Sequence, residues 1–297
     1  MRVISLLPGV TDTIVALGGS PLLVGVSHSC DHAAVARVPR VTAAAIDPAA
    51  PPGEIDAAVR EMTAAGRPLH ALNESAIDRL QPDLIFTQAL CDVCAVSEAE
   101  VARVASGLRS HPRVVSLSGG TIDGLLDDVM TVGRATGLAD EAEELVLGLR
   151  RRMRRVHDAL KAARAPRPRV ALLEWTDPLF ASGHWVPEQV RRAGGTDVLA
   201  EPGAHSRAIP VRVLLEANPA VVLVAPCGFG VRRAAEDARR LLSAYPALER
   251  AQVWALDANV LTSRPGPRVV DGIEIMAQIL APALFSPVPE ALARRIA

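Results

Sequence analysis

The sequence predicts an α/β protein: two Rossmann-like lobes with mostly parallel sheets, joined by one long backbone helix. Three observations support this prediction. Short apolar runs alternate with amphipathic helical patterns in both halves of the chain. One helical pattern near the middle is longer than any other, and 297 residues are enough for two domains with a core each. We predict an N-terminal lobe at 1–137, a connecting helix at 138–164 and a C-terminal lobe at 165–297.

The long helix separates the two halves. From Leu138 to Arg164, apolar residues recur at spacings of three and four, which places them on one face of an α-helix, and the opposite face is charged. At about 1.5 Å per residue this segment is roughly 40 Å long, enough to pass from one lobe to another. Gly137 and the proline-containing run 165–168 are typical helix ends. A long helix inside one large α/β domain is the alternative.

The first half alternates strand and helix patterns, which implies parallel pairing of the strands. Thr11 and Asp12 are candidate caps for the entry of its first helix. The predicted strands are 2–6, 23–27, 83–87 and 114–117, and the predicted helices are 8–17, 54–65, 73–80, 98–109 and 121–136.

The second half repeats the same plan. Ligands of open parallel sheets bind at the carboxyl ends of the strands, so two facing lobes would place a binding site in the cleft between them. The predicted strands are 169–173, 220–224 and 252–256, and the predicted helices are 186–193, 211–217, 232–242 and 268–280.

Composition excludes several classes of protein. Hydrophobic residues make up 49% and charged residues 22%, as in ordinary globular proteins, and the net charge of −1 gives no support to nucleic acid as a partner. No apolar run reaches the length of a membrane span. The first residues read as a buried strand rather than as a secretory leader, so we expect a cytoplasmic location.

Two loops of the first half carry thiols and an imidazole just after predicted strands. His28 and Cys30 follow one strand, and Cys91 and Cys94 follow another. A Cys-x-x-Cys spacing can chelate one metal ion, and Cys30 and His28 could complete a site for zinc or an iron–sulfur cluster. The alternative is that the cysteines are small buried apolar residues. A thioredoxin-type redox role is less favoured, because Asp92 lies between the two thiols.

The second half offers aromatic and imidazole side chains at its strand ends. Glu174 and Trp175 follow the first predicted strand, and His184 lies between Gly183 and Trp185. The glycine permits close backbone approach, the indole provides a flat apolar wall, and the imidazole provides a nitrogen ligand or a hydrogen bond. These features favour a binding cleft, although a lone histidine is often a structural residue.

Several enzyme motifs are absent from the sequence. There is no phosphate-binding G-x-x-x-x-G-K-[ST] loop and no G-x-S-x-G nucleophile elbow. The only lysine, Lys161, lies on the long helix, which argues against Schiff-base chemistry in the cleft. Binding is therefore favoured over catalysis.

The order of motifs resembles the Fe/B12 periplasmic-binding family, and most of all a leaderless subgroup of its cobalamin-binding branch. The resemblance rests on Ile4 to Pro8, Thr11-Asp12, Leu17-Gly18, Leu23 to Ser27 and Pro82 to Ile85, followed by the long helix. It implies a corrinoid, such as cobalamin, or another metal chelate held between the lobes and passed to a membrane permease. By this resemblance the pocket would be lined by Pro8, Thr11, Gln88, Trp175, His184, Trp185 and Arg264, with His184 near the metal.

The chain departs from the resemblance at the permease-docking positions. Each lobe of the transport proteins has a glutamate there, whereas this chain has Ser75 and Arg212, with Glu74 and Glu216 nearby. A docked ABC permease is thus not favoured, and the small molecule is the expected partner. The leading hypothesis is a cytoplasmic, non-enzymatic cobalamin-type binding protein. The alternative is a metalloprotein or metalloenzyme on the same scaffold, using the three cysteines above with His28 or His184.

Overall fold

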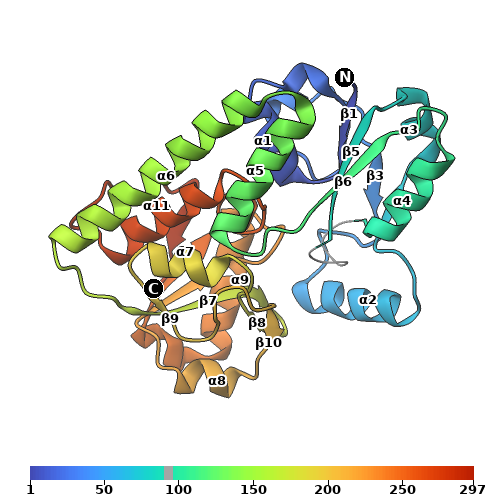
Figure 1. Ribbon diagram of the computed structural model, residues 1–297. Helices are drawn as coiled ribbons and strands as arrows, with labels where there is room; N and C mark the ends of the chain where they lie inside the picture. The colour runs from blue at the N-terminus through green and yellow to red at the C-terminus, as the bar shows by residue number, and fades with distance from the viewer. Residues whose placement is uncertain (90–95) are drawn as a thin grey trace. The chain divides into compact units, whose positions relative to one another are not determined.

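The computed structural model describes residues 1–89 and 96–297 (Figure 1). The described chain forms two compact units, each assembled from more than one segment. Unit 1 comprises Met1–Gly119, Asp123–Leu147 and Pro265–Pro267, and unit 2 comprises Gly120–Ile122, Gly148–Arg264 and Arg268–Ala297.

Unit 1 is built on a four-stranded sheet of order β2-β1-β5-β6, in which every neighbouring pair is parallel. Short apolar strands at its centre, such as the completely buried Val3 and Ile4, are typical of a sheet covered on both faces. The predicted α/β class with parallel pairing is therefore confirmed here. The strands are β1 (Val3–Ser5), β2 (Leu23–Val26), β5 (Leu84–Gln88) and β6 (Arg113–Leu117).

The helices of unit 1 lie close to the predicted ranges. Asn73 and Ser97 cap α3 and α4 by accepting hydrogen bonds from Ala76 N and Glu100 N. Val101 and Val104 of α4 pack in a core with Ile85 of the sheet. The elements are α1 (Pro8–Ala16), η1 (Ser20–Leu22), η2 (Ala33–Val35), α2 (Pro52–Ala64), α3 (Glu74–Leu80), α4 (Glu98–Gly107), α5 (Ile122–Thr136) and an antiparallel pair, β3 (Thr42–Ala44) with β4 (His70–Leu72).

The predicted caps of the first helix are wrong. Helix α1 begins at Pro8, its N-cap residue is Leu7, and no side chain caps it. Proline suits the first helical position because its fixed φ is already helical and it has no N–H to satisfy. Thr11 and Asp12 therefore lie inside the helix, where both are buried.

Unit 2 contains a seven-stranded sheet whose long central strands are parallel, with short strands added beside them in both antiparallel and parallel pairing. Strand β11 (Val221–Val224) pairs in parallel with β7 (Arg169–Thr176) and β12 (Gln252–Leu256), as predicted. The short strands of this sheet were not predicted, because two or three residues are too few to show a period. These are β8 (Leu179–Ala181), β9 (Thr196–Asp197), β10 (Arg207–Ala208) and β13 (Ala293–Arg295).

The helices of unit 2 again follow the apolar periodicity. Ala234, Ala238 and Leu241 of α9 pack on Val222 and Val224 of β11 to form the core. The helices are α7 (Val186–Arg192), α8 (Val211–Glu216), α9 (Val231–Ala244), η3 (Pro246–Arg250), α10 (Ala258–Leu261) and α11 (Val269–Leu280).

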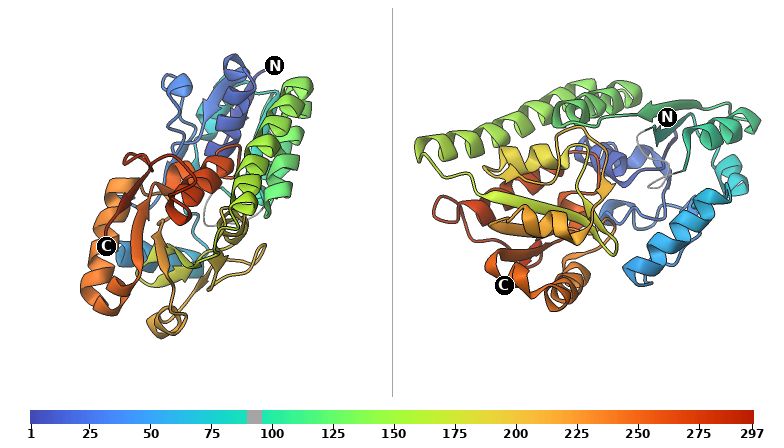
Figure 2. Two further views of the ribbon diagram at one scale, coloured as in Figure 1. Left: turned by 90° about the vertical axis from the view of Figure 1, so that its left-hand side faces the viewer. Right: turned by 90° about the horizontal axis from the view of Figure 1, so that it is seen from below.

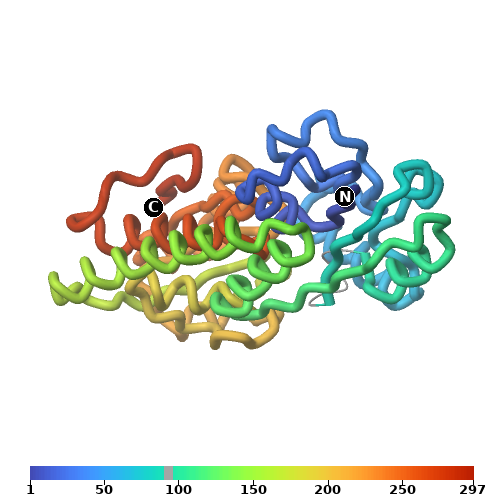
Figure 3. The backbone as a smooth tube through the Cα atoms, turned by 45° about the horizontal axis from the view of Figure 1, so that its top comes forward, coloured from blue at the N-terminus to red at the C-terminus, as the bar shows by residue number. Residues whose placement is uncertain are grey.

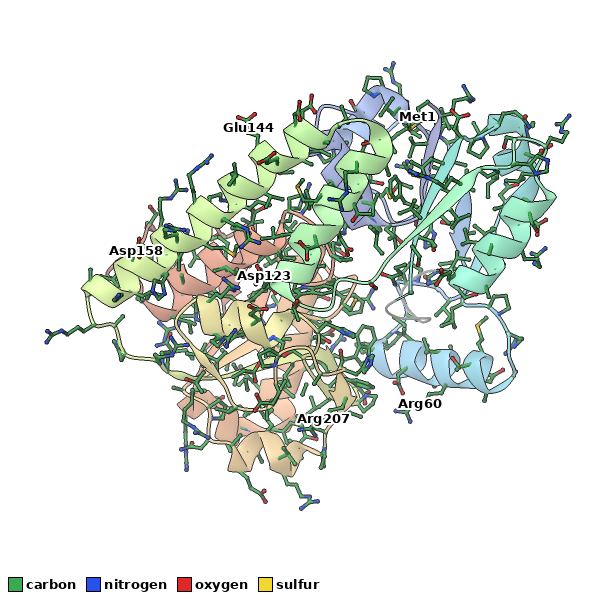
Figure 4. All side chains as sticks on the ribbon, viewed as in Figure 1. Met1, Arg60, Asp123, Glu144, Asp158 and Arg207 are labelled. Atoms are coloured by element: carbon green, nitrogen blue, oxygen red, sulfur yellow. The ribbon has the colours of Figure 1, made fainter. Side chains whose placement is uncertain are left out.

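The long connecting helix is a single element, α6 (Ala139–Ala162), and Figure 2 and Figure 3 show it without interruption. Its residues up to Leu147 belong to unit 1 and those from Gly148 onward to unit 2. Glu144 and Asp158 project from its exposed side (Figure 4). Just past its middle, Arg152 donates to Glu274 through Nε (3.0 Å) and Nη2 (2.5 Å), and it also donates to Asp271. This ion-pair group fixes the second part of α6 on α11, within unit 2.

Replacing Gly148 with alanine is expected to stabilise the protein by about 0.5–1 kcal/mol. A Cβ atom built at Gly148 would meet only Arg151 Nη2 at 3.8 Å, and alanine loses less backbone entropy on folding. Urea unfolding followed by circular dichroism measures the change. A lower midpoint for Gly148→Ala would show that this point of α6 needs the freedom of glycine.

Candidate functional site

The carboxyl edge of the unit 1 sheet is formed by the residues that end or follow β1, β2 and β5. Pro8 is half-buried at the start of α1, and Gln88 is buried at the end of β5. A small cavity of about 10 Å³, room for about one water molecule, lies beside them. Its lining residues are Leu7, Val10, Gln88, Leu117, Gly119, Asp128 and Pro265.

Thr11 and Cys30 connect α1 to the loop after β2. Thr11 is completely buried, and its hydroxyl donates to Ser5 Oγ at 2.9 Å. The Cys30 Sγ atom, also buried, lies 3.2 Å from Thr11 Oγ1. Both side chains therefore tie β1, α1 and the loop together inside unit 1.

His28 lies in the same loop and has two close neighbours. Its Nδ1 atom is 2.6 Å from Thr42 Oγ1, and its ring centre is 5.5 Å from that of His70. Burial lowers the pKa of His28, and the nearby His70 lowers it further. The neutral imidazole is thus favoured at neutral pH.

The predicted cysteine-centred metal site stays a prediction. Cys91 and Cys94 lie outside the described residues. Within 1–89 and 96–297, no three His, Cys, Asp or Glu side chains are grouped so that they could hold a metal ion. Of the other two predicted ligands, Cys30 contacts Thr11, and His28 contacts Thr42 and His70.

At the carboxyl edge of the unit 2 sheet, Glu174 joins two loops. The prediction that Glu174 and Trp175 follow the strand is wrong, because β7 continues to Thr176 and pairs with β8. Glu174 Oε1 accepts a hydrogen bond from Gly183 N at 3.2 Å, and Oε2 accepts one from Ser206 Oγ at 2.5 Å. One carboxylate therefore holds the loop at 183–185 beside the loop at 203–206.

The backbones of these two loops are in close contact. His184 N donates to Ala204 O at 2.6 Å, and Gly203 N donates to His184 O at 2.8 Å. A Cβ atom at Gly183 would lie 2.2 Å from Ser206 N, so only glycine fits there. The predicted close approach at this glycine is made by the chain's own second loop.

The paired loops bring two histidines together. The ring centres of His184 and His205 are 5.0 Å apart, with an interplanar angle of 84°. Burial, and next the neighbouring His205, lower the pKa of His184. His184 has a left-handed backbone with φ of +54°, which is uncommon for a residue other than glycine and which the hydrogen bonds on both sides maintain. His205 was not predicted, because only the folded loops make it a neighbour of His184.

The two tryptophans of the predicted site differ in their surroundings. Trp185 is only 5% exposed, and its Nε1 donates to Thr262 O at 2.9 Å, so it anchors its loop. Trp175 is half-buried, with its ring centre 5.2 Å from that of Phe229. The guanidinium carbon of Arg233 lies 3.5 Å from the centre of the Phe229 ring. Phe229 and Arg233 were not predicted, since both lie after β11, far along the chain.

The segment after α10 contributes to both units. Arg264, predicted to line the pocket, is 9% exposed and belongs to unit 2. The next three residues belong to unit 1, where Pro265 packs on α1 so tightly that a Cβ atom at Gly9 would lie 1.8 Å from its carbonyl oxygen.

Asp197 introduces a pH dependence into the same region of unit 2. Its carboxylate accepts hydrogen bonds from Ser182 Oγ, Leu199 N and Ala200 N, yet burial raises its pKa from 3.8 to about 6. The folded state therefore keeps a proton on Asp197 that the unfolded state loses above pH 3.8. This contribution to stability falls as the pH rises from 3.8 to about 6 and stays lost above that.

Asp197→Asn is therefore expected to change the free energy of unfolding more favourably at pH 8 than at pH 4, by about 2 kcal/mol. The amide oxygen can accept from the same two backbone N–H groups, and the amide nitrogen can donate to Ser182. Urea midpoints of both proteins at pH 4, 6 and 8 measure the difference. Equal shifts at all three values would show that Asp197 is ionised normally in the folded protein.

Comparison with solved structures shows the same fold in proteins of low sequence identity. A periplasmic haem-binding protein from Pseudomonas aeruginosa is 22% identical, with a TM-score of 0.73 over 99% of this chain and 97% of that one. The periplasmic vitamin B12 binding protein of Vibrio cholerae is also 22% identical, with a TM-score of 0.66 over 95% and 97% of the two chains. An ABC transporter substrate-binding protein from Listeria monocytogenes is 17% identical, with a TM-score of 0.68 over 95% and 98%.

None of the curated proteins compared matches the chain significantly. Among the described residues, no helix has the length and apolar character needed to span a bilayer.

The family model described as "Periplasmic binding protein" matches residues 3–260, which include most of both units. Together with the two α/β units and the long helix α6, this match shows that the chain belongs to the periplasmic binding protein family.

Proposed function

We propose that this protein binds a metal-containing tetrapyrrole, of the corrinoid or haem class, at the carboxyl edge of the unit 2 sheet. The single observation that carries the proposal is the pair of imidazoles, His184 and His205, on two loops that Glu174 holds together. A neutral imidazole nitrogen is a ligand for iron or cobalt. Cobalamin, the ligand implied by the resemblance, is one member of this class.

Neighbouring side chains suit the rest of such a ligand. The half-buried Trp175 offers flat apolar surface, as a macrocycle requires, and the buried Phe229 ring packs beside it with ring centres 5.2 Å apart. Arg233, whose guanidinium stacks on Phe229, adds a positive charge that favours the carboxylates of haem or the phosphate of cobalamin. Haem- and B12-binding proteins of the same fold support this ligand class.

The proposal is one of binding without catalysis. It uses residues of unit 2, and contacts from Pro8, Thr11 and Gln88 stay predictions. So do the cytoplasmic location and the absence of a docked permease. At the two docking positions, Ser75 is exposed and donates to Asn73 Oδ1, and Arg212 is exposed on α8.

A spectral titration tests the proposal. The purified full chain is titrated with haemin, hydroxocobalamin and metal-free protoporphyrin IX. We expect a shifted Soret or cobalamin absorption band and a dissociation constant in the micromolar range or below for at least one of the metal compounds. Protoporphyrin IX should bind more weakly, because it has no metal for an imidazole. Equal binding of all three, or of none, would contradict the proposal.

A further inference from the structure

A second pair of histidines lies in unit 1, outside the site proposed above. His28 follows β2, and His70 is the first residue of β4. Their side chains are half-buried, and their ring centres are 5.5 Å apart with an interplanar angle of 34°. The fold thus brings together two imidazoles that are distant in the sequence.

Thr42 fixes which nitrogen of His28 is available. The Thr42 hydroxyl donates to Ser27 Oγ at 3.2 Å and accepts from His28 N at 2.9 Å. Since its proton is used toward Ser27, the 2.6 Å contact with His28 Nδ1 is one in which Nδ1–H donates. The Nε2 atom of His28 then carries a lone pair. Metal-binding histidines are usually oriented in this way, by a hydrogen bond from the other ring nitrogen.

The separation of the two rings suits a shared metal ion. An ion bound at about 2.1 Å by one nitrogen of each ring lies roughly 3.2 Å from each ring centre, so a tetrahedral angle places the centres about 5.2 Å apart. The observed 5.5 Å differs little from this value. Imidazole nitrogen is a preferred ligand of zinc, nickel and copper ions.

We propose that His28 and His70 together bind a divalent transition-metal ion, of which Zn²⁺ is the probe, with solvent completing the coordination. This site uses no cysteine, so it differs from the predicted cysteine-centred site, and it does not depend on tetrapyrrole binding. Two protein ligands predict a moderate, micromolar affinity and an ion that exchanges readily.

Calorimetric titration of the metal-free full chain with ZnCl₂ tests the proposal. To remove the other candidate ligands, Cys91→Ser, Cys94→Ser, Cys227→Ser and His205→Gln are combined in the parent protein, the last because the ring centres of His184 and His205 are also only 5.0 Å apart. We expect one zinc ion per chain, and at least tenfold weaker binding after either His28→Gln or His70→Gln. His111→Gln, at an exposed histidine outside the pair, is the matched control and should bind as the parent does.

Several results would overturn the proposal. No zinc binding by the parent would do so, as would binding that His70→Gln leaves unchanged. Because a substitution at a half-buried site can disturb folding, ring carbon–proton NMR spectra of the parent, in which His28 and His70 are intact, give an independent result. Zinc should move the signals of His28 and His70 among the six histidines that remain after His205→Gln, and movement of a different set would refute the site.

Thr42 provides a further test, because its hydroxyl should affect zinc binding only if it orients His28 as a ligand. Thr42→Val has nearly the same shape but no hydroxyl, so the tautomer of His28 is no longer fixed. We expect roughly tenfold weaker zinc binding. Thr42→Ser retains the hydroxyl and should restore the affinity of the parent. Identical affinities for both variants would show that Thr42 does not orient the site.

Discussion

Replacing His184 with asparagine is expected to weaken the binding of haemin or hydroxocobalamin at least tenfold, or about 1.4 kcal/mol. The substitution removes the proposed metal-binding nitrogen. Asparagine is chosen because it tolerates the left-handed backbone of this residue, with its φ of +54°, better than most residues do. The backbone hydrogen bonds of residue 184 with Ala204 O and Gly203 N can then persist. Absorption titration measures the dissociation constant directly.

His205→Asn separates the roles of the two histidines. If His205 only positions His184 through the contact between their rings, its replacement should weaken binding less and leave the absorption band of the complex unchanged. His157→Asn, at an exposed position of α6, serves as the control. Should His184→Asn and this control bind equally well, the imidazole of His184 would not be a ligand of the metal.

Replacing Gly9 with alanine is expected to destabilise the protein by about 3 kcal/mol or more. The added Cβ atom would lie 1.8 Å from Pro265 O and 2.6 Å from Pro265 C, both backbone atoms that cannot rotate away. The segment Pro265–Pro267 must therefore move off α1, or α1 must shift in unit 1. The urea midpoint, with unchanged far-ultraviolet circular dichroism of the folded state, measures the loss.

Gly107→Ala is the matched control for Gly9→Ala. Both glycines are in helices and have negative φ, but nothing lies within 4 Å of a Cβ atom at Gly107. Its replacement should change the midpoint little or raise it slightly. Equal midpoints for the two variants would mean that Pro265 yields to the extra methyl group without cost.

Periodicity predicted the parts of the fold that depend on local patterns. Helix α6 was predicted at 138–164 and is found at Ala139–Ala162, because its apolar face, including Ala142, Val146, Leu149, Met153 and Val156, is buried at regular intervals. In a long helix the apolar period remains recognisable even where a single residue does not fit it. The short strand β8 has no such redundancy, and its existence depends on pairing with β7.

The candidate site was predicted less completely, for a physical reason. His184 and Gly183 were found, since glycine next to histidine after a strand is visible in the sequence. His205, Phe229 and Arg233 become neighbours of the predicted residues only when separate loops fold together. Trp185 was expected to provide a flat apolar wall, yet it is only 5% exposed, and its indole N–H donates to Thr262 O. Residue type alone does not reveal which aromatic ring remains accessible.

The division of the chain restricts how this architecture can be recombined. The backbone passes from one unit to the other at five points, after Gly119, Ile122, Leu147, Arg264 and Pro267. A single genetic crossover within α6 would thus transfer residues 1–147 without the tripeptide that packs against Gly9. A chimaera of two homologues would then face a foreign tripeptide at the tightest backbone contact of α1. Exchange of half-genes is therefore disfavoured unless Pro265–Pro267 is transferred together with residues 1–147.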